Sequence, residues 1–307
     1  MDSSPNDPQR PYRVALTSVE TSVDPALTRA FDLLGETLSL AQRATGLVTI
    51  KPNLTAPRAS GSGVVSDVAV VAAFVRLLRE RAPSVERIVV ADGPGMVDTF
   101  RCFEVAGYNS LRDLGVELID LNAAPTRPTS VPGSLRYSVL EIPEVVLDAD
   151  LFVSITPPKT HTDGLYTLHA KNMYGVPPTR FYGRPRRAFH RAGVPEVVHD
   201  ICRARPIDLA ITDATVGTQL GDPIDGEPVI LGALAVGWNT QAVDIVSCGL
   251  MGVDPRRSAY LQYLRAAGYG PIDLDEIDII GDSLIDLSKR FAIPRPDDRR
   301  PQASSAH

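Results

Sequence analysis

Short runs of apolar, often β-branched residues alternate along the chain with longer segments in which apolar residues recur every three or four positions. The short runs are continuous and do not alternate with polar residues, which is typical of strands buried on both faces of a sheet. We predict strands at 13–18, 47–50, 87–91, 116–120, 151–155, 209–212, 230–236 and 277–280.

The segments between these runs have the spacing of amphipathic helices. The clearest is 66–81, which we expect to begin at Ser66 as its N-cap. Its expected apolar face carries Val68, Val71, Ala72, Val75 and Leu78. Asp24 and Pro25 indicate the start of an earlier helix. Strand, helix, strand order predicts an α/β protein with a mainly parallel sheet and helices on both faces.

A length of 307 residues suits one elaborated α/β domain, which we place at 12–288. Two interwoven lobes with a boundary near 125–132 are the alternative, because 123–133 is a Pro-rich connection. The ends, 1–11 and 293–307, are polar and lack periodicity, so we expect flexible tails there.

Charge and cysteine content exclude several classes of protein. With 31 Lys and Arg against 37 Asp and Glu, the net charge of −6 argues against a nucleic-acid partner. Three scattered cysteines, Cys102, Cys202 and Cys248, do not form a CxxC zinc site or a disulfide framework, which favours a reducing, cytoplasmic setting. No apolar stretch is long enough for a membrane span, so no membrane partner is expected. The sequence leaves open whether the protein forms a homo-oligomer.

Polar residues follow several predicted strands directly. Lys51 and Asn53 follow 47–50, and Asp92 follows 87–91. Lys159 and His161 come soon after 151–155, while Asp213 follows 209–212. Because ligands of open parallel sheets bind outside the carboxyl ends of the strands, we expect these side chains to converge on one crevice.

The segment 157–175, PPKTHTDGLYTLHAKNMYG, contains the highest density of candidate catalytic and binding side chains. Together with other runs it resembles the ordered motifs of the domain of unknown function 362 family. The matching runs are KPN (51–53), ADGPG (91–95), PPKTH (157–161), AKNMYG (170–175), TDA (212–214), AVD (242–244), LMGVDP (250–255) and AAGYG (266–270). The resemblance covers about residues 13–282 and identifies a family, not an activity. Many members are similar but add a Cys-rich iron–sulfur module, which this chain lacks, so no iron–sulfur cluster is expected.

The leading hypothesis is an enzyme that acts on a small carboxylate or phosphate metabolite by lysine and histidine acid–base chemistry. Lys159 and His161 would transfer protons, as in an isomerase, racemase, lyase or ring-forming enzyme. Lys51 and Lys171 would bind the anion, since a cluster of lysines at one sheet edge needs a negative partner. The further substrate-binding candidates are Asn53, Asp92, Asn172 and Arg187.

Each of these residues also has a structural interpretation. Lys51 could be a solvated strand end, and Asp92 and Asp213 could cap helices. Asp244 interrupts the apolar run 242–246, so we expect either a lysine partner or a metal-ligand role beside Asp213. A divalent metal is therefore the candidate cofactor. The alternative function is a metal-dependent enzyme or a non-catalytic ligand- or metal-binding accessory of a redox system.

The segment 176–193 is rich in arginine and aromatic residues. It contains Arg180, Arg184, Arg186, Arg187 and Arg191, with Phe181, Tyr182, Phe189 and His190 interleaved. We expect a long loop with few buried positions that acts as a lid over an anionic substrate, with glycines as hinges. A solvated basic loop is the alternative.

Overall fold

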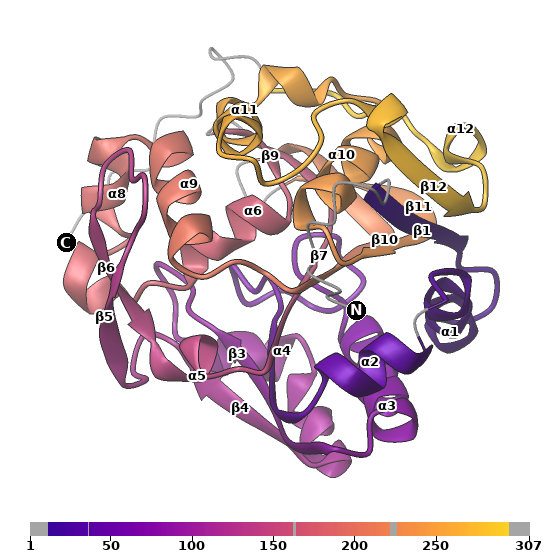
Figure 1. Cartoon of the computed structure of the whole chain (residues 1–307), viewed down its shortest axis with the longest axis horizontal. Coiled ribbons are helices and arrows are strands. Elements are labelled where there is room, and N and C mark those ends of the chain that lie inside the picture. Colours follow the sequence, from indigo (N-terminus) through magenta and orange to yellow (C-terminus); the bar gives the residue numbers. More distant parts are fainter. Residues whose placement is uncertain (1–11, 36, 162–163, 222–225, 295–307) are drawn as a thin grey trace.

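The computed structural model describes residues 12–35, 37–161, 164–221 and 226–294. Its centre is a mixed, mostly parallel sheet (Figure 1). In order across the sheet the strands are β12 (Ile277–Gly281), β1 (Tyr12–Ser18), β11 (Glu227–Gly237), β10 (Leu209–Gly221), β7 (Leu151–Thr156), β2 (Gly46–Lys51), β3 (Val85–Asp92) and β4 (Val116–Asp120). Only β11 runs antiparallel to its neighbours in this order. The predicted strands and the α/β class are confirmed.

Two strands are much longer than their apolar runs. β10 and β11 pair as an antiparallel ribbon that continues from Ala210 opposite Gly237 to Gln219 opposite Glu227. The added length carries β8 (Lys159–His161), which pairs with β10, and β9 (Leu165–Thr167), which pairs with β8. Backbone hydrogen bonds between the two strands, and not burial of apolar side chains, hold this extension in place. The apolar runs in the sequence therefore end before the strands do.

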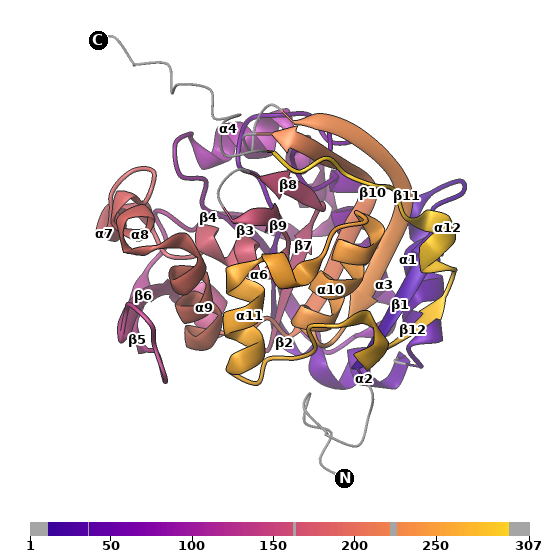
Figure 2. The same cartoon turned by 90° about the horizontal axis from the view of Figure 1, so that it is seen from above.

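Helices cover both faces of the sheet (Figures 1 and 2). α1 (Val23–Leu33) and α3 (Val68–Arg81) each bury their apolar face in a core on one side of the sheet. This core contains Phe31, Phe74, Ile50 and Val153. α9 (Val194–Ala204), α10 (Thr240–Leu250) and α11 (Ala259–Ala266) cover the other face, where Phe152, Ile201 and Ile245 are buried. Across the described residues, no helix is long and apolar enough to cross a membrane.

Shorter helices complete the chain. They are α2 (Thr37–Arg43), α4 (Thr99–Val105), α5 (Glu144–Leu147), α12 (Leu284–Leu287) and the 3-10 helices η1 (Tyr108–Leu114), η3 (Pro255–Arg257) and η4 (Leu274–Glu276). α1 begins at Val23 with Ser22 as its N-cap, two residues before the expected N-cap at Asp24.

The N-cap of α3 is Asp67 and not Ser66. The Asp67 carboxylate accepts the backbone N–H of Ala69 at 2.9 Å. The Ser66 hydroxyl instead donates to Ile155 O at 2.7 Å and accepts the backbone N–H of Asn53 at 2.8 Å. Ser66 therefore ties the chain that leaves β2 to the end of β7, at the place where the expected crevice lies.

The Pro-rich connection contains a hairpin of its own. β5 (Thr126–Ser130) and β6 (Val139–Pro143) form a two-stranded sheet beside α8 (Arg187–Ala192) and α9, at the left of Figure 1. The buried Asp200 carboxylate on α9 accepts three consecutive backbone N–H groups of the hairpin, from Leu135 to Tyr137, at 2.7 to 2.8 Å. The hairpin is thereby fixed to the helix layer.

The segment 176–193 is folded, so the prediction of an open loop with few buried positions is wrong. It holds α7 (Thr179–Tyr182) and α8 (Arg187–Ala192). The rings of Tyr182 and Phe189 are 4.2 Å apart, and Tyr137 and Tyr174 stack edge-on against Phe189. Phe189 is fully buried. Tyr182 and Phe189 thus belong to a small aromatic core, whereas Phe181 is exposed.

Candidate active site

The candidate site lies where the direction of chain crossover reverses in the sheet. β2 connects through α3 to β3 on one side, whereas β7 leads to β10 on the other side. The connections that leave the adjacent, paired strands β2 and β7 therefore run to opposite sides, and the point between them is the usual position of a ligand crevice in an open α/β sheet. Lys51 ends β2, Asp92 ends β3, and Lys159 follows β7 by three residues.

A buried ion pair joins the first two strand ends. Lys51 Nζ lies 2.5 Å from Asp92 Oδ1, and the residues are 1% and 3% exposed. Lys51 Nζ also donates to Asn172 Oδ1 and to Pro52 O, both at 3.1 Å. Burial lowers the pKa of Lys51, and the Asp92 charge opposes this effect. Because all three ammonium hydrogens already have acceptors, Lys51 has no hydrogen left for a substrate anion.

Lys159 is the second buried lysine at this edge, and it is 2% exposed. Its Nζ donates to Asn53 Oδ1 at 2.6 Å and to Val64 O at 2.8 Å. Burial, together with the charge of Lys171, lowers the pKa of Lys159 to about 7. A neutral amine has two hydrogens and one lone pair, so these two acceptors leave the lone pair of Lys159 to take a proton.

Two asparagines connect the lysines. Asn172 Oδ1 accepts Lys51 Nζ and also Asn53 Nδ2, the latter at 3.0 Å. Asn53 Oδ1 in turn accepts Lys159 Nζ. The other end of the Asn172 amide donates to Ser154 Oγ at 3.1 Å. Sequence reasoning placed both asparagines at a substrate, whereas the structure shows them holding the lysines.

His161 lies at the far end of β8 and is 7% exposed. Burial lowers its pKa to about 3, and the nearby charges of Lys171, Lys159 and His190 act in the same direction. Lys171 Nζ lies 4.5 Å from the ring centre of Tyr174, and the His190 ring is 5.5 Å from the same ring. Lys171 from α6 (His169–Asn172) and His190 from α8 thus both lie against the ring of Tyr174.

Arg186 is a site residue that sequence reasoning missed. It is 2% exposed and donates to Gly93 O and Pro177 O at 2.8 Å and to Gly175 O at 3.0 Å. Burial lowers its pKa to about 10. Arg187, which the sequence favoured, is exposed on α8. The sequence around Arg186 and Arg187 does not indicate which of the two is buried. In the structure, the backbone of Arg186 lies in the left-handed region, with φ of 72°.

Glycine is required where Arg186 draws two loops together. A Cβ on Gly93 would lie 2.8 Å from Gly175 O. A Cβ on Gly175 would lie 3.0 Å from Lys51 Nζ and 3.3 Å from Asp92 Oδ1. Gly175 belongs to the 3-10 helix η2 (Met173–Gly175) that follows α6. The glycines of ADGPG and AKNMYG therefore let the backbone close over the ion pair.

A family model described as "Domain of unknown function (DUF362)" matches residues 48–249, which include these motifs. The chain belongs to this family. A thylakoid-associated protein, sll1697, of Synechocystis is 24% identical over 229 residues, covering 73% of this chain and 68% of that protein. A lactate racemase apoprotein structure from Thermoanaerobacterium thermosaccharolyticum aligns with a TM-score of 0.47 and 14% identity. That alignment covers 78% of this chain and 57% of the other.

In this DUF362 chain, Asp244 and His169 serve the short helix α6. The Asp244 carboxylate accepts the backbone N–H groups of His169 at 2.8 Å and Ala170 at 3.1 Å. The prediction that a lysine pairs with Asp244 is therefore wrong. Burial raises the pKa of Asp244 to about 7. The His169 ring lies between Ser154 Oγ and Thr212 Oγ1, both at 2.9 Å, and burial lowers its pKa to about 3.

Asp213 lies on the opposite face of the sheet from Asp244. Its carboxylate accepts the backbone N–H of Asp67 at the start of α3, at 2.7 Å, and the hydroxyl of Thr215 at 2.6 Å. Asp244 belongs to α10, on the other layer. The structure therefore does not bring the two expected metal ligands together. Among the described residues, no group of three or more His, Cys, Asp or Glu side chains is placed to hold a metal ion.

Proposed function

We propose that this DUF362 protein is an enzyme that moves a proton on a small carboxylate- or phosphate-bearing metabolite, with Lys159 as the general base. One observation carries the proposal: a buried lysine with a pKa of about 7 at the crossover point of the sheet, with two acceptors that suit its neutral form. General bases are most effective when their pKa lies near the working pH, and strongly perturbed groups concentrate at functional sites.

Lys171 is the proposed anion-binding group. It is half-buried, whereas Lys51 is fully buried and saturated by its acceptors. Burial lowers the pKa of His161, and the positive charge of Lys171 lowers it in the same direction. A bound anion would offset that charge and raise the pKa values of both Lys159 and His161. Lys159 would then retain the proton that it removes from the substrate, and His161 would act as the second proton-transfer group.

The remaining polar residues would act by positioning. Lys51 and Asp92 neutralise each other. Asn172 and Asn53 link this ion pair to Lys159 through consecutive hydrogen bonds and so fix the position of its amine. A rigid frame of this kind keeps the amine in place when its charge changes, which is the condition for efficient electrostatic stabilisation.

Proton abstraction beside a carboxylate is the first step shared by isomerases, racemases, many lyases and ring-forming enzymes. The negative charge that develops on the substrate would face Lys171 and the protonated Lys159, which would stabilise it.

Hydrogen–deuterium exchange tests this proposal without knowledge of the product. Small carboxylates and phosphates are incubated with the protein in D₂O, and loss of C–H signals is followed by NMR. We expect exchange with the wild-type protein and a loss of about 10²- to 10⁴-fold in Lys159→Met. Lys289→Met, at an exposed lysine, is the matched control. Equal rates in wild type and Lys159→Met would contradict the base role, and binding without exchange would favour the non-catalytic alternative.

A further inference from the structure

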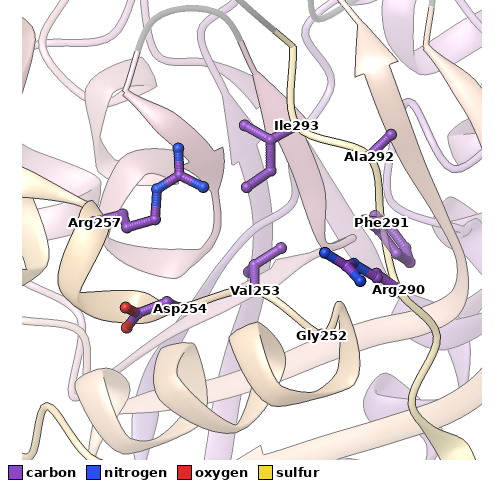
Figure 3. A pocket seen from close by; sticks show the side chains of 8 residues that line it. All are labelled: Gly252, Val253, Asp254, Arg257, Arg290, Phe291, Ala292 and Ile293. Atoms are coloured by element: carbon purple, nitrogen blue, oxygen red, sulfur yellow. The ribbon is translucent and has the colours of Figure 1, made fainter.

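An open cavity lies away from the lysine network. It has a volume of about 300 Å³ and lies between the turn after α10 and the chain after α12 (Figure 3). Val253 and Ile293 supply apolar side chains that point into it, and Arg257 and Arg290 stand on opposite sides. The volume is at the lower end of the range of roughly 300–1,000 Å³ that is typical of small-molecule sites.

Backbone hydrogen bonds hold the two walls of this cavity in place. Lys289 N donates to Leu250 O at 2.9 Å, and Phe291 N donates to Met251 O at 2.8 Å. The next residue, Ala292, is fixed on both sides: its N–H donates to Gln219 Oε1, and its carbonyl accepts Thr160 Oγ1, each at 2.8 Å. The cavity is therefore shaped before any ligand binds, which lowers the entropic cost of binding.

The charges around the cavity favour an anion. Within the described residues, no ion pair joins the guanidinium of Arg257 or Arg290 to a carboxylate, whereas the neighbouring Arg256 pairs with Asp273. Asp254 also lines the cavity, but its side chain points away from the centre and Oδ1 accepts the backbone N–H of Arg256 at 3.0 Å. Two like charges beside one cavity raise its positive potential, which an oxyanion would offset.

We propose that this cavity is a binding site for a small organic carboxylate. The two guanidinium groups take the carboxylate oxygens, since arginine forms paired hydrogen bonds with this group. Val253 and Ile293 contact the short apolar part of the ligand. The site shares no residue with the lysine network, so it stands or falls independently of the proposed enzymatic function.

Butyrate is the probe, and butyramide and inorganic phosphate are its controls. We expect calorimetry at low ionic strength to show butyrate binding, with butyramide and phosphate at least about tenfold weaker. The variant Arg257→Gln/Arg290→Gln should weaken butyrate binding by at least about tenfold. Arg101→Gln, at an exposed arginine on α4 that pairs with Glu104, should change it by less than about twofold.

Protection from phenylglyoxal locates the site in the unmodified sequence. Butyrate should slow the modification of Arg257 and Arg290, read by mass spectrometry, and should leave Arg101 unchanged. The same protection should persist in Lys171→Gln, which separates this cavity from the candidate active site. Unchanged butyrate affinity in the double variant, equal binding of butyramide, or protection that disappears with Lys171 would each overturn the proposal.

Discussion

Replacing Lys159 with methionine should change how the stability of the protein depends on pH. The lysine has a pKa of about 7 in the folded protein. In the unfolded chain a lysine has a pKa of about 10.4. Unfolding therefore takes up a proton between these two pH values, and the free energy of unfolding contributed by this residue rises with pH.

The magnitude follows from the two pKa values. Between about pH 7.5 and about pH 9.5, the linkage relation gives a rise of about 2.5 kcal/mol in the free energy of unfolding from Lys159 alone. Methionine keeps most of the side-chain volume and removes the ionisation. The stability difference, wild type minus Lys159→Met, should therefore increase by that amount across the interval, whatever constant cost the lost hydrogen bonds add.

Urea unfolding of both proteins at several pH values in this interval measures the difference. Lys51 is buried as well, but it is present in both proteins, so most of its contribution cancels. Lys289→Met, at the exposed lysine, should give a difference that stays nearly constant with pH. A constant difference for Lys159→Met would mean that Lys159 remains charged in the folded protein, and the proposed base role would then be untenable.

Two further substitutions test the contacts around the site. Arg186→Lys loses the planar fork that reaches three carbonyls and should destabilise the protein by about 2–3 kcal/mol, whereas the exposed Arg187→Lys should stay within about 0.5 kcal/mol. Equal effects in urea unfolding would argue against the buried clamp. Asp244→Ala removes the acceptor of two buried N–H groups and should cost about 2–4 kcal/mol, compared with less than about 0.5 kcal/mol for the exposed Asp275→Ala. Similar losses in thermal unfolding would contradict the capping role.

Periodicity and strand-end chemistry were sufficient for the framework of this protein. Every predicted strand is present, because short continuous apolar runs between turn residues are typical of strands buried on both faces of a sheet. Part of the expected convergence is present: Lys51 contacts Asp92, and Asn53 contacts Lys159. Asp213 instead binds the backbone N–H of Asp67. Parallel strands bring their carboxyl ends to one edge of the sheet, so order along the chain already implies proximity there.

Only the tertiary structure decided which polar side chains are buried and which hydrogen-bond partners they have. Lys51 and Lys159 are both lysines after strands, yet one is saturated by an ion pair and the other keeps a lone pair. Arg186 and Arg187 are adjacent, yet one is buried and the other is exposed. Asp244 caps a helix that lies seventy-five residues earlier in the chain. Burial and hydrogen-bond partners come from segments distant in sequence, and local residue patterns carry no information about them.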